Sequence, residues 1–448
     1  MRTPGKDAAQ SMCNFCTESE VPIEPRRGAP ALRYHGSMQR DFLGNPVGAQ
    51  RDPTLHGIDD FIEGYLAYES RAERILAAAD AEPESCLANA YSGMLWMLLE
   101  APEGARHAAK YLGAAERAAL HATRREQLKT AMLRAWVDDD MARTLRLCDQ
   151  ISDEFPRDLV IVKTHQYFEF NRGNASEMLR VALKAASQSA DVPYMHGMTA
   201  FAYEQCHLLD EAESEARIAL QMRRKEPWAQ HALAHVFLTR GRIDEGACFL
   251  EEAADTWTGL NSFMVTHIWW HLALFYLSQG RNREVLDLYD RHCWGIAKDY
   301  SQDQIGAVSL LARCELAGID VGPRWEDLGR HLAVRAQDTT LPFLTLQYLY
   351  GLARAGLPEA DTLLEAVRRR AATAPSFTRA VWRDVALPGC EGLHAHARGD
   401  YAEAWRRLAP IVPRMVEVGG SHAQRDLFDQ ILRDSAIRSG HTTASHTI

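Results

Sequence analysis

The sequence predicts an all-α protein, a right-handed solenoid of antiparallel helix pairs. Residues 193–226 and 227–260 are two copies of one helical-hairpin pattern, spaced 34 residues apart. Small residues recur at equivalent places in the copies: Ala200, Ala212 and Ala219 in the first, and Ala234, Gly246 and Ala253 in the second. Side chains this small let antiparallel helices approach closely, and a 34-residue period is typical of tetratricopeptide (TPR) arrays. No alternating run long enough for a useful strand interrupts the helical periodicity.

The remaining elements follow in order from helical periodicity and its Gly, Pro and Asp/Asn stops. The first helices are expected at 57–79, 82–99, 104–120, 123–137 and 139–155. Repeat units follow at 157–189, in the two copies, and at 266–297 after an insertion at 261–265. Later pairs are 301–317 with 323–336, 341–355 with 358–372 and 377–398 with 401–417, before a closing helix at 421–438. Pro388 should kink or split its helix, because proline removes a backbone donor.

These elements make one TPR-like solenoid over 41–440, with about 16–20 helices and its clearest repeats at 157–297. No sheet beyond a hairpin is expected. Residues 1–40 show little periodicity and are expected to be a flexible leader, and 441–448 a disordered tail. Cys13 and Cys16 form the only CxxC. No strand precedes this pair and there is no second CxxC, so we expect these two cysteines to belong to the flexible leader and favour this over a metal or redox role.

Composition narrows the class of protein. The chain is 46% apolar and 25% charged, as in ordinary globular proteins. A net charge of −10 argues against a nucleic-acid partner, and no apolar run approaches the roughly 20 residues that span a bilayer. Nine scattered cysteines and the lack of a signal-peptide core predict reduced thiols in a cytoplasmic protein. The sequence leaves open whether the protein forms a homodimer.

Histidines gather on one expected face of the solenoid. In a TPR unit the first helix lines the concave groove, and its second, fifth, ninth and twelfth residues point inward. Counting from Gly241 and Gly280, the inward residues are Tyr194, Phe201 and Glu204 in one unit, His231 and His235 in the next, and His267 and Trp270 in the third. His271 falls one residue off this register, so its direction is left open.

Three interpretations of this face remain. Residues four apart on a helix share a face, so His231, His235 and His267, with Glu204, could hold zinc or a similar divalent ion, which needs three or four ligands. The same face could form a polar pocket for a small organic ligand or a peptide. Alternatively, the histidines are structural and bond to nearby carbonyls and hydroxyls. Phosphate-binding and nucleophile-elbow motifs are absent, so no catalytic residue is identified.

Several segments resemble the tetratricopeptide repeat protein 38 family. They are Trp228-Ala-Gln-His-Ala-Leu-Ala-His235, His267-Ile-Trp-Trp-His271, Leu288-Tyr-Asp290, Arg383-Asp-Val-Ala-Leu-Pro388 and Gly419-Gly-Ser-His-Ala-Gln-Arg-Asp426. His165, in a Lys-Thr-His-Gln-Tyr context, also fits, whereas His422 departs from the Asn of the family pattern. The resemblance runs from about residue 40 to 438. It implies an all-helical TPR-like fold and no settled activity.

The segment 419–426 also has a direct physical interpretation. Gly419 and Gly420 allow a left-handed turn, and Ser421 can cap the next helix. Arg425 and Asp426 then lie in its first turns, where free N–H groups beside an arginine could bind an anion. We favour a structural role over anion binding: the segment caps the helix, and an internal arginine–carboxylate pair locks the last hairpin onto the body.

Two functions follow. The first is a cytoplasmic TPR-like protein whose His- and aromatic-lined groove binds a peptide or small organic ligand. The second is an enzyme, metal-dependent in one version, with His165 and the four histidines of 231–271 in an enclosed pocket. Binding ranks first because TPR-like arrays are usually non-catalytic.

Overall fold

The computed structural model describes residues 39–48 and 50–441, and this part of the chain is all-α. The expected leader up to residue 38, including Cys13 and Cys16, lies outside the described residues, as does the expected tail from 442 onward. Within the described ranges the chain forms 22 α-helices and two strands of two residues each. The prediction of an all-helical fold without a substantial sheet is confirmed.

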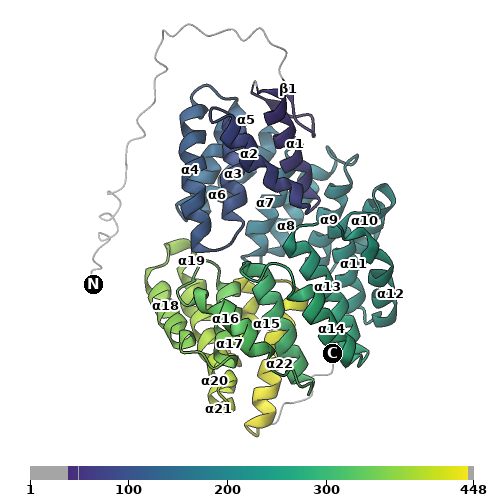
Figure 1. Ribbon diagram of the computed structural model, residues 1–448, viewed down its shortest axis with the longest axis vertical. Coiled ribbons are helices and arrows are strands. Elements are labelled where there is room, and N and C mark those ends of the chain that lie inside the picture. The colour runs from purple at the N-terminus through teal and green to yellow at the C-terminus, as the bar shows by residue number, and fades with distance from the viewer. Residues whose placement is uncertain (1–38, 49, 442–448) are drawn as a thin grey trace, which may run out of the picture. The chain divides into compact units, whose positions relative to one another are not determined.

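The helices follow one another along the chain with short connections (Figure 1). The first eight are α1 (Asp52–Leu66), α2 (Arg74–Ala81), α3 (Cys86–Met97), α4 (Pro102–Ala119), α5 (Arg124–Val137), α6 (Met141–Glu154), α7 (Leu159–Phe170) and α8 (Ala175–Ala186). The next seven are α9 (Pro193–Gln205), α10 (Leu209–Met222), α11 (Pro227–Thr239), α12 (Ile243–Ala253), α13 (Ser262–Ser278), α14 (Asn282–Leu288) and α15 (Ser301–Leu316). The last seven are α16 (Arg324–Leu332), α17 (Pro342–Arg354), α18 (Glu359–Thr373), α19 (Ser376–Val381), α20 (Leu387–Ala397), α21 (Tyr401–Leu408) and α22 (His422–Arg438).

The two strands form a small antiparallel hairpin, β1 (Gln39–Arg40) and β2 (Pro46–Val47). Its turn is anchored to the helices by Arg125, whose Nη2 lies 2.8 Å from the Asp41 carboxylate while Nε lies 2.7 Å from Asp158. All three side chains are fully buried. A buried ion pair thus holds the turn that follows β1, and β1 begins within the last two residues of the expected leader.

The 34-residue spacing has a clear local origin. α9 starts at Pro193 and α11 at Pro227, where a proline fits the first helical turn because that N–H needs no partner. α11 and α13 are each followed, two residues on, by a glycine in the left-handed region, Gly241 (φ 65°) and Gly280 (φ 72°). Such glycines end helices without steric cost. The helical pairs of the two repeat copies are thus confirmed.

Two expected helices are divided, and this raises the number of helices above the 16–20 expected. The expected helix at 57–79 breaks into α1 and α2, because the chain turns through Tyr68 (φ 56°) and the 3₁₀ segment η1 (Ser70–Glu73). The expected helix at 377–398 breaks into α19 and α20, joined by the π-helical segment η5 (Trp382–Ala386). Pro388 follows directly, at the start of α20, in line with its predicted helix-splitting effect.

Helices pack mainly against their neighbours in sequence, and small residues allow close contact. Ala200, Ala212, Ala219 and Ala234 are completely buried. A Cβ added at Gly246 on α12 would lie 2.3 Å from the ring of Phe275 on α13. The expectation of small residues at the helix crossings is confirmed.

Contacts between distant segments bring parts of this body together. Ser301 Oγ donates to the Leu99 carbonyl at 2.9 Å, and the Gln302 amide donates to the Glu100 carboxylate. At the other end of the chain, His422 on α22 lies 3.2 Å from the Gln205 carbonyl at the end of α9. The N-terminal helices, α15 and α22 therefore border a common interior.

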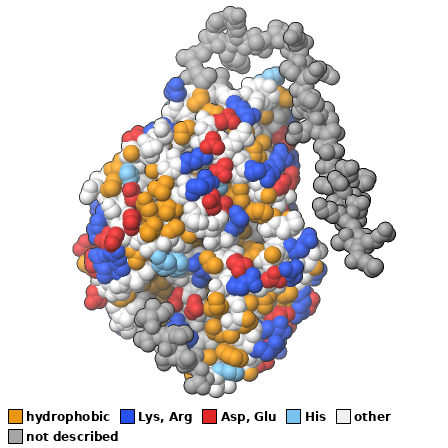
Figure 2. All heavy atoms as spheres, turned by 180° about the vertical axis from the view of Figure 1, so that it is seen from behind, with side chains coloured by type: hydrophobic (Ala, Val, Ile, Leu, Met, Phe, Trp, Pro, Cys, Tyr) orange, Lys and Arg blue, Asp and Glu red, His pale blue; other side chains and the backbone are white. Residues whose placement is uncertain are grey.

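The outer surface is of mixed charge. On the face seen in Figure 2, acidic and basic side chains are interspersed. Many of them are paired, as in Arg134–Glu116 at 2.8 Å. None of the helices described here is both long enough and apolar enough to cross a membrane.

Candidate functional site

A cavity of about 400 Å³ lies inside the body formed by residues 39–441. Its lining runs from Tyr65 on α1 to Gln424 on α22, so segments from both ends of the chain enclose it. Eight aromatic side chains dominate the wall: Tyr65, Tyr68, Tyr167, Phe170, Phe201, Trp228, Phe263 and Tyr300. This volume and largely apolar wall are typical of sites for small organic molecules.

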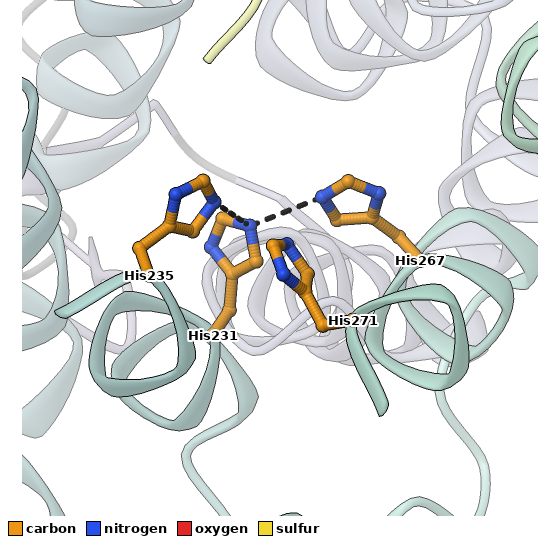
Figure 3. Close-up of side chains that lie close together, drawn as sticks. All are labelled: His231, His235, His267 and His271. Carbon is orange, nitrogen blue, oxygen red and sulfur yellow. Dashed lines mark hydrogen bonds between the residues drawn. The ribbon is translucent and has the colours of Figure 1, made fainter. Parts of the chain in front are cut away.

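Four histidines converge beside this cavity, two from α11 and two from α13 (Figure 3). His231 Nε2 lies 3.1 Å from Nε2 of both His235 and His267. His271 completes the group, whose ligand atoms all lie within 4.8 Å of one another. His231 and His267 also line the cavity. The i,i+4 spacing on each helix and the packing of α11 against α13 together create the group.

Glu204 on α9 supports the cluster from behind. Its Oε1 lies 3.5 Å from Nδ1 of His235, and both side chains are buried. Burial opposes ionisation of Glu204, but the interaction with His235 and the hydrogen bond from Gln205 outweigh burial and lower the pKa of Glu204. An ionised Glu204 favours a proton on Nδ1 of His235, which leaves a lone pair on Nε2, directed at the cluster.

That tautomer leaves the cluster short of hydrogen-bond donors. With a lone pair on His235 Nε2, His231 Nε2 must donate to it, and this single N–H cannot also serve His267. Both ring nitrogens of His271 and Nδ1 of His231 are buried without any partner among the described residues. Buried polar atoms are rarely left unpaired. A bound cation would use the lone pairs that the protein leaves free.

Three histidines of the cluster, His231, His267 and His271, stay neutral at neutral pH. Burial, followed by the neighbouring imidazoles, holds the pKa of His231 and of His271 well below the usual value. Burial also lowers the pKa of His267 to about 3, and the charge of His235 adds to this effect. Neutral imidazole is the form that binds metal ions.

The structure places the predicted inward residues differently at one helix. His231, His235, His267 and Glu204 lie together, as the register indicated. At α13, however, His271 joins the cluster, whereas Trp270 is buried, stacks on His267 with ring centroids 5.3 Å apart, and does not line the cavity. Counted back from Gly280, Trp270 corresponds to His231 counted from Gly241, so the cluster residue His271 lies one residue off the standard register.

His165 and the 419–426 segment also fall outside the cluster. His165 is buried on α7, 3.7 Å from Glu169 of its own helix, and is not among the cavity-lining residues. Arg425 bonds to the Gly420 carbonyl and lies 3.2 Å from His422. Asp426 receives a hydrogen bond of 2.8 Å from the buried Arg313 on α15.

The helix cap expected at the start of α22 is present. Gly419 and Gly420 have φ of 88° and 82°, and Ser421 and Gln424 form a capping box. The Arg313–Asp426 pair ties this helix to α15. These contacts agree with the interpretation of 419–426 as a cap and lock.

Sequence patterns missed three residues that face the cavity: Tyr68, Glu100 and Lys163. Tyr68 and Glu100 follow helices at positions with positive φ, 56° and 54°, where glycine is common. Lys163 Nζ lies 3.2 Å above the Tyr68 ring and donates to the carbonyls of Tyr65 and Leu66. For Tyr68 and Glu100 the sequence did offer a signal, because a bulky or charged residue stands where a helix-ending glycine is expected.

No protein-family model matches this chain. The resemblance to the tetratricopeptide repeat protein 38 family rests on the segments quoted above.

Proposed function

We propose that this protein binds a divalent transition metal ion, with zinc the best fit, in the four-histidine cluster, and a small organic molecule in the adjoining cavity. The scaffold is a right-handed TPR-like solenoid, related to the tetratricopeptide repeat protein 38 family. The equivalent starts of α9 and α11, 34 residues apart, support the TPR-like assignment. The seven cysteines in the described part, all free, support a cytoplasmic location.

One observation carries the metal assignment: buried imidazoles converge while several of their nitrogens have no partner. Tetrahedral zinc with Zn–N bonds of about 2.0–2.1 Å places its ligand nitrogens about 3.3 Å apart. The two Nε2–Nε2 distances of 3.1 Å are close to this spacing. Purely structural histidines would be expected to bond to carbonyls or hydroxyls, and His271 does neither.

The cavity favours a small molecule over an extended peptide. Its volume of about 400 Å³ and its aromatic wall suit a compact ligand. A metal held by the cluster is adjacent to that ligand, because His231 and His267 belong to both.

A metal-dependent hydrolase is the second candidate. Zinc with three protein ligands keeps a fourth position for water and lowers the pKa of that water to about 7. The location of His231 and His267 on the cavity wall favours an open position that faces the ligand. Zinc-loaded protein should then hydrolyse 4-nitrophenyl acetate faster than protein treated with EDTA. Equal rates would exclude the hydrolytic version and leave the binding function standing.

Metal analysis tests the proposed function directly. Full-length protein purified without chelator should contain about one equivalent of zinc or a similar ion, and His231→Ala should remove it. Adding zinc to metal-free protein should raise the melting temperature, since a ligand of the native state stabilises that state. His121→Ala, at an exposed histidine, is the control and should keep its metal. Metal-free protein whose stability does not respond to zinc would refute the assignment.

A further inference from the structure

Glu100 is a carboxylic acid in an unusual place on the cavity wall. Its side chain lines the cavity, yet the residue is only 5% exposed. The amide of Gln302 donates to its Oε2 atom. No lysine, arginine or histidine forms an ion pair with it within the described ranges. Buried carboxylates are ordinarily paired with a cation, whereas the partners of Glu100, the Gln302 amide and the Tyr167 hydroxyl, are both neutral.

The backbone at Glu100 is strained to hold the side chain there. Glu100 follows the end of α3 by three residues and has φ of 54°. Gly173 takes the same place after α7, with φ of 65°. For a residue other than glycine this conformation is strained, because the Cβ atom crowds the backbone. Strain of this kind is kept where a side chain has a task, and here the side chain points into a cavity.

Charges around the cavity favour a cation over an anion. Its charged lining residues outside the histidine cluster are Glu69, Glu73, Glu100 and Lys163. Glu69 is already paired with Arg71, Arg223 and Lys225, and Glu73 is exposed. Lys163 donates to two carbonyls, and burial lowers its pKa well below the usual value. Glu100 is therefore the buried carboxyl group of this lining that has no cationic partner among the described residues.

The aromatic wall suits an ammonium group as well. Lys163 Nζ already lies 3.2 Å from the centroid of the Tyr68 ring and 4.8 Å from that of Tyr65. Ammonium groups are attracted to the faces of aromatic rings, most strongly where water is excluded. Tyr167 and Tyr300 line the cavity as well, and the Tyr167 hydroxyl hydrogen-bonds to the Glu100 carboxylate.

We infer that Glu100 forms an amine-binding subsite, so that the ligand of this cavity is a small aromatic or aliphatic amine bound as its ammonium ion. The ammonium group pairs with the Glu100 carboxylate, and the apolar part of the ligand packs on the aromatic wall. This inference rests on the proposed function for the cavity, but it requires no metal ligand from Glu100.

Three probes of similar size test the inference by calorimetric titration of the full-length protein: 2-phenylethylamine, 2-phenylethanol and 3-phenylpropionate. The amine should bind at least 10-fold more tightly than the alcohol, and the carboxylate should bind weakest. Each titration is run on zinc-loaded and EDTA-treated protein. Amine binding that survives EDTA while zinc content is zero would separate this subsite from the metal centre.

Variants connect the binding to the carboxylate. Glu100→Gln keeps the shape of the side chain and should weaken 2-phenylethylamine at least 10-fold, with no change for 2-phenylethanol. Glu100→Asp serves as a second variant if the first fails to fold. Glu103→Gln, an exposed glutamate three residues on, is the matched control and should bind like the wild type. The inference would be overturned if the three probes bind equally, if none of the three binds, or if Glu100→Gln keeps its full affinity for the amine.

Discussion

Glu204 Oε1 lies 3.5 Å from Nδ1 of His235, on the opposite side of the imidazole from the atom that meets His231. A carboxylate in this position orients a metal-binding histidine and raises its basicity. Glu204 thus lies behind the cluster. Sequence analysis suggested that Glu204 could itself bind the metal, but the four imidazoles are better placed to do so.

Glu204→Gln should weaken zinc binding by 10–100-fold, the range typical for loss of a carboxylate behind a ligating histidine. The protein should still fold, because Gln fills the same space. A competition titration against a chromogenic zinc chelator measures the change. Glu211→Gln on α10, at an exposed glutamate, should match the wild type. Unchanged affinity in Glu204→Gln would remove the supporting role.

His235→Ala and His267→Ala should each melt within a few degrees of the metal-free parent, since these rings make few bonds that the rest of the protein depends on. Both variants should lose the zinc-dependent rise in stability, which reaches about 2.7 kcal/mol when free zinc is 100 times Kd. Thermal unfolding with and without zinc measures both effects. A double variant that is unfolded at room temperature would show that the histidines are structural core residues.

Glu100 should make the protein less stable as pH rises. Burial raises its pKa from 4.5 to about 7, against the opposing hydrogen bond from Gln302. The folded state therefore holds this proton more tightly than the unfolded state. The resulting stabilisation is complete below pH 4.5 and is lost as pH rises through 7. Between pH 5 and pH 8, the titration of Glu100 should lower the free energy of unfolding by about 2–3 kcal/mol.

In Glu100→Gln that loss should be absent, so the variant becomes more stable relative to the wild type at pH 8 than at pH 5. Urea unfolding at both pH values gives the difference. The raised pKa values of Glu226 and Asp303 act in the same direction, but they are common to both proteins and cancel in the comparison. Parallel pH profiles for wild type and variant would contradict the assignment.

Gly246→Ala should destabilise the protein by about 1–3 kcal/mol, because the new methyl group would meet the Phe275 ring at 2.3 Å. Gly306→Ala is the matched control. Gly306 lies within α15 with open space around its missing Cβ, so alanine should stabilise by about 0.5–1 kcal/mol through its helix propensity. Melting temperatures that move in the same direction for both variants would refute the close packing of α12 on α13.

The sequence predicted the helices best where the repeat is regular. The boundaries of α9, α11 and α13 are set locally, by prolines at helix starts and glycines just after helix ends, and such residues can be found by counting along the chain. They are Pro193, Pro227, Gly241 and Gly280. His271 could not be assigned in the same way, because it lies one residue off the register counted from Gly280, and its direction depends on how α13 packs against α11. That the histidines come together depends on the packing of α11 against α13, which the repeat implies.

Glu100 and Lys163 escaped prediction for a different reason. Their significance comes from the cavity and from partners far away in sequence, such as Gln302, and no local periodicity reports such contacts. Helix-ending positions occupied by Tyr68 or His207 in place of glycine carry the same kind of information. His207 stands at the place where the next repeat has Gly241, and its ring contacts that of His422 on α22, with centroids 4.0 Å apart and ring planes tilted by 47°.

The hydrogen bonds from Tyr300, Ser301 and Gln302 to Leu98, Leu99 and Glu100 all join residues 202 positions apart. A ribosome adding about 5–20 residues per second needs about 10–40 s to travel that distance. During this interval the first helices have emerged while the far wall of the cavity does not yet exist. The aromatic surface of Tyr65, Tyr68 and Tyr167 is then open to water and to chaperones, so the cavity is among the last features of the nascent protein to form.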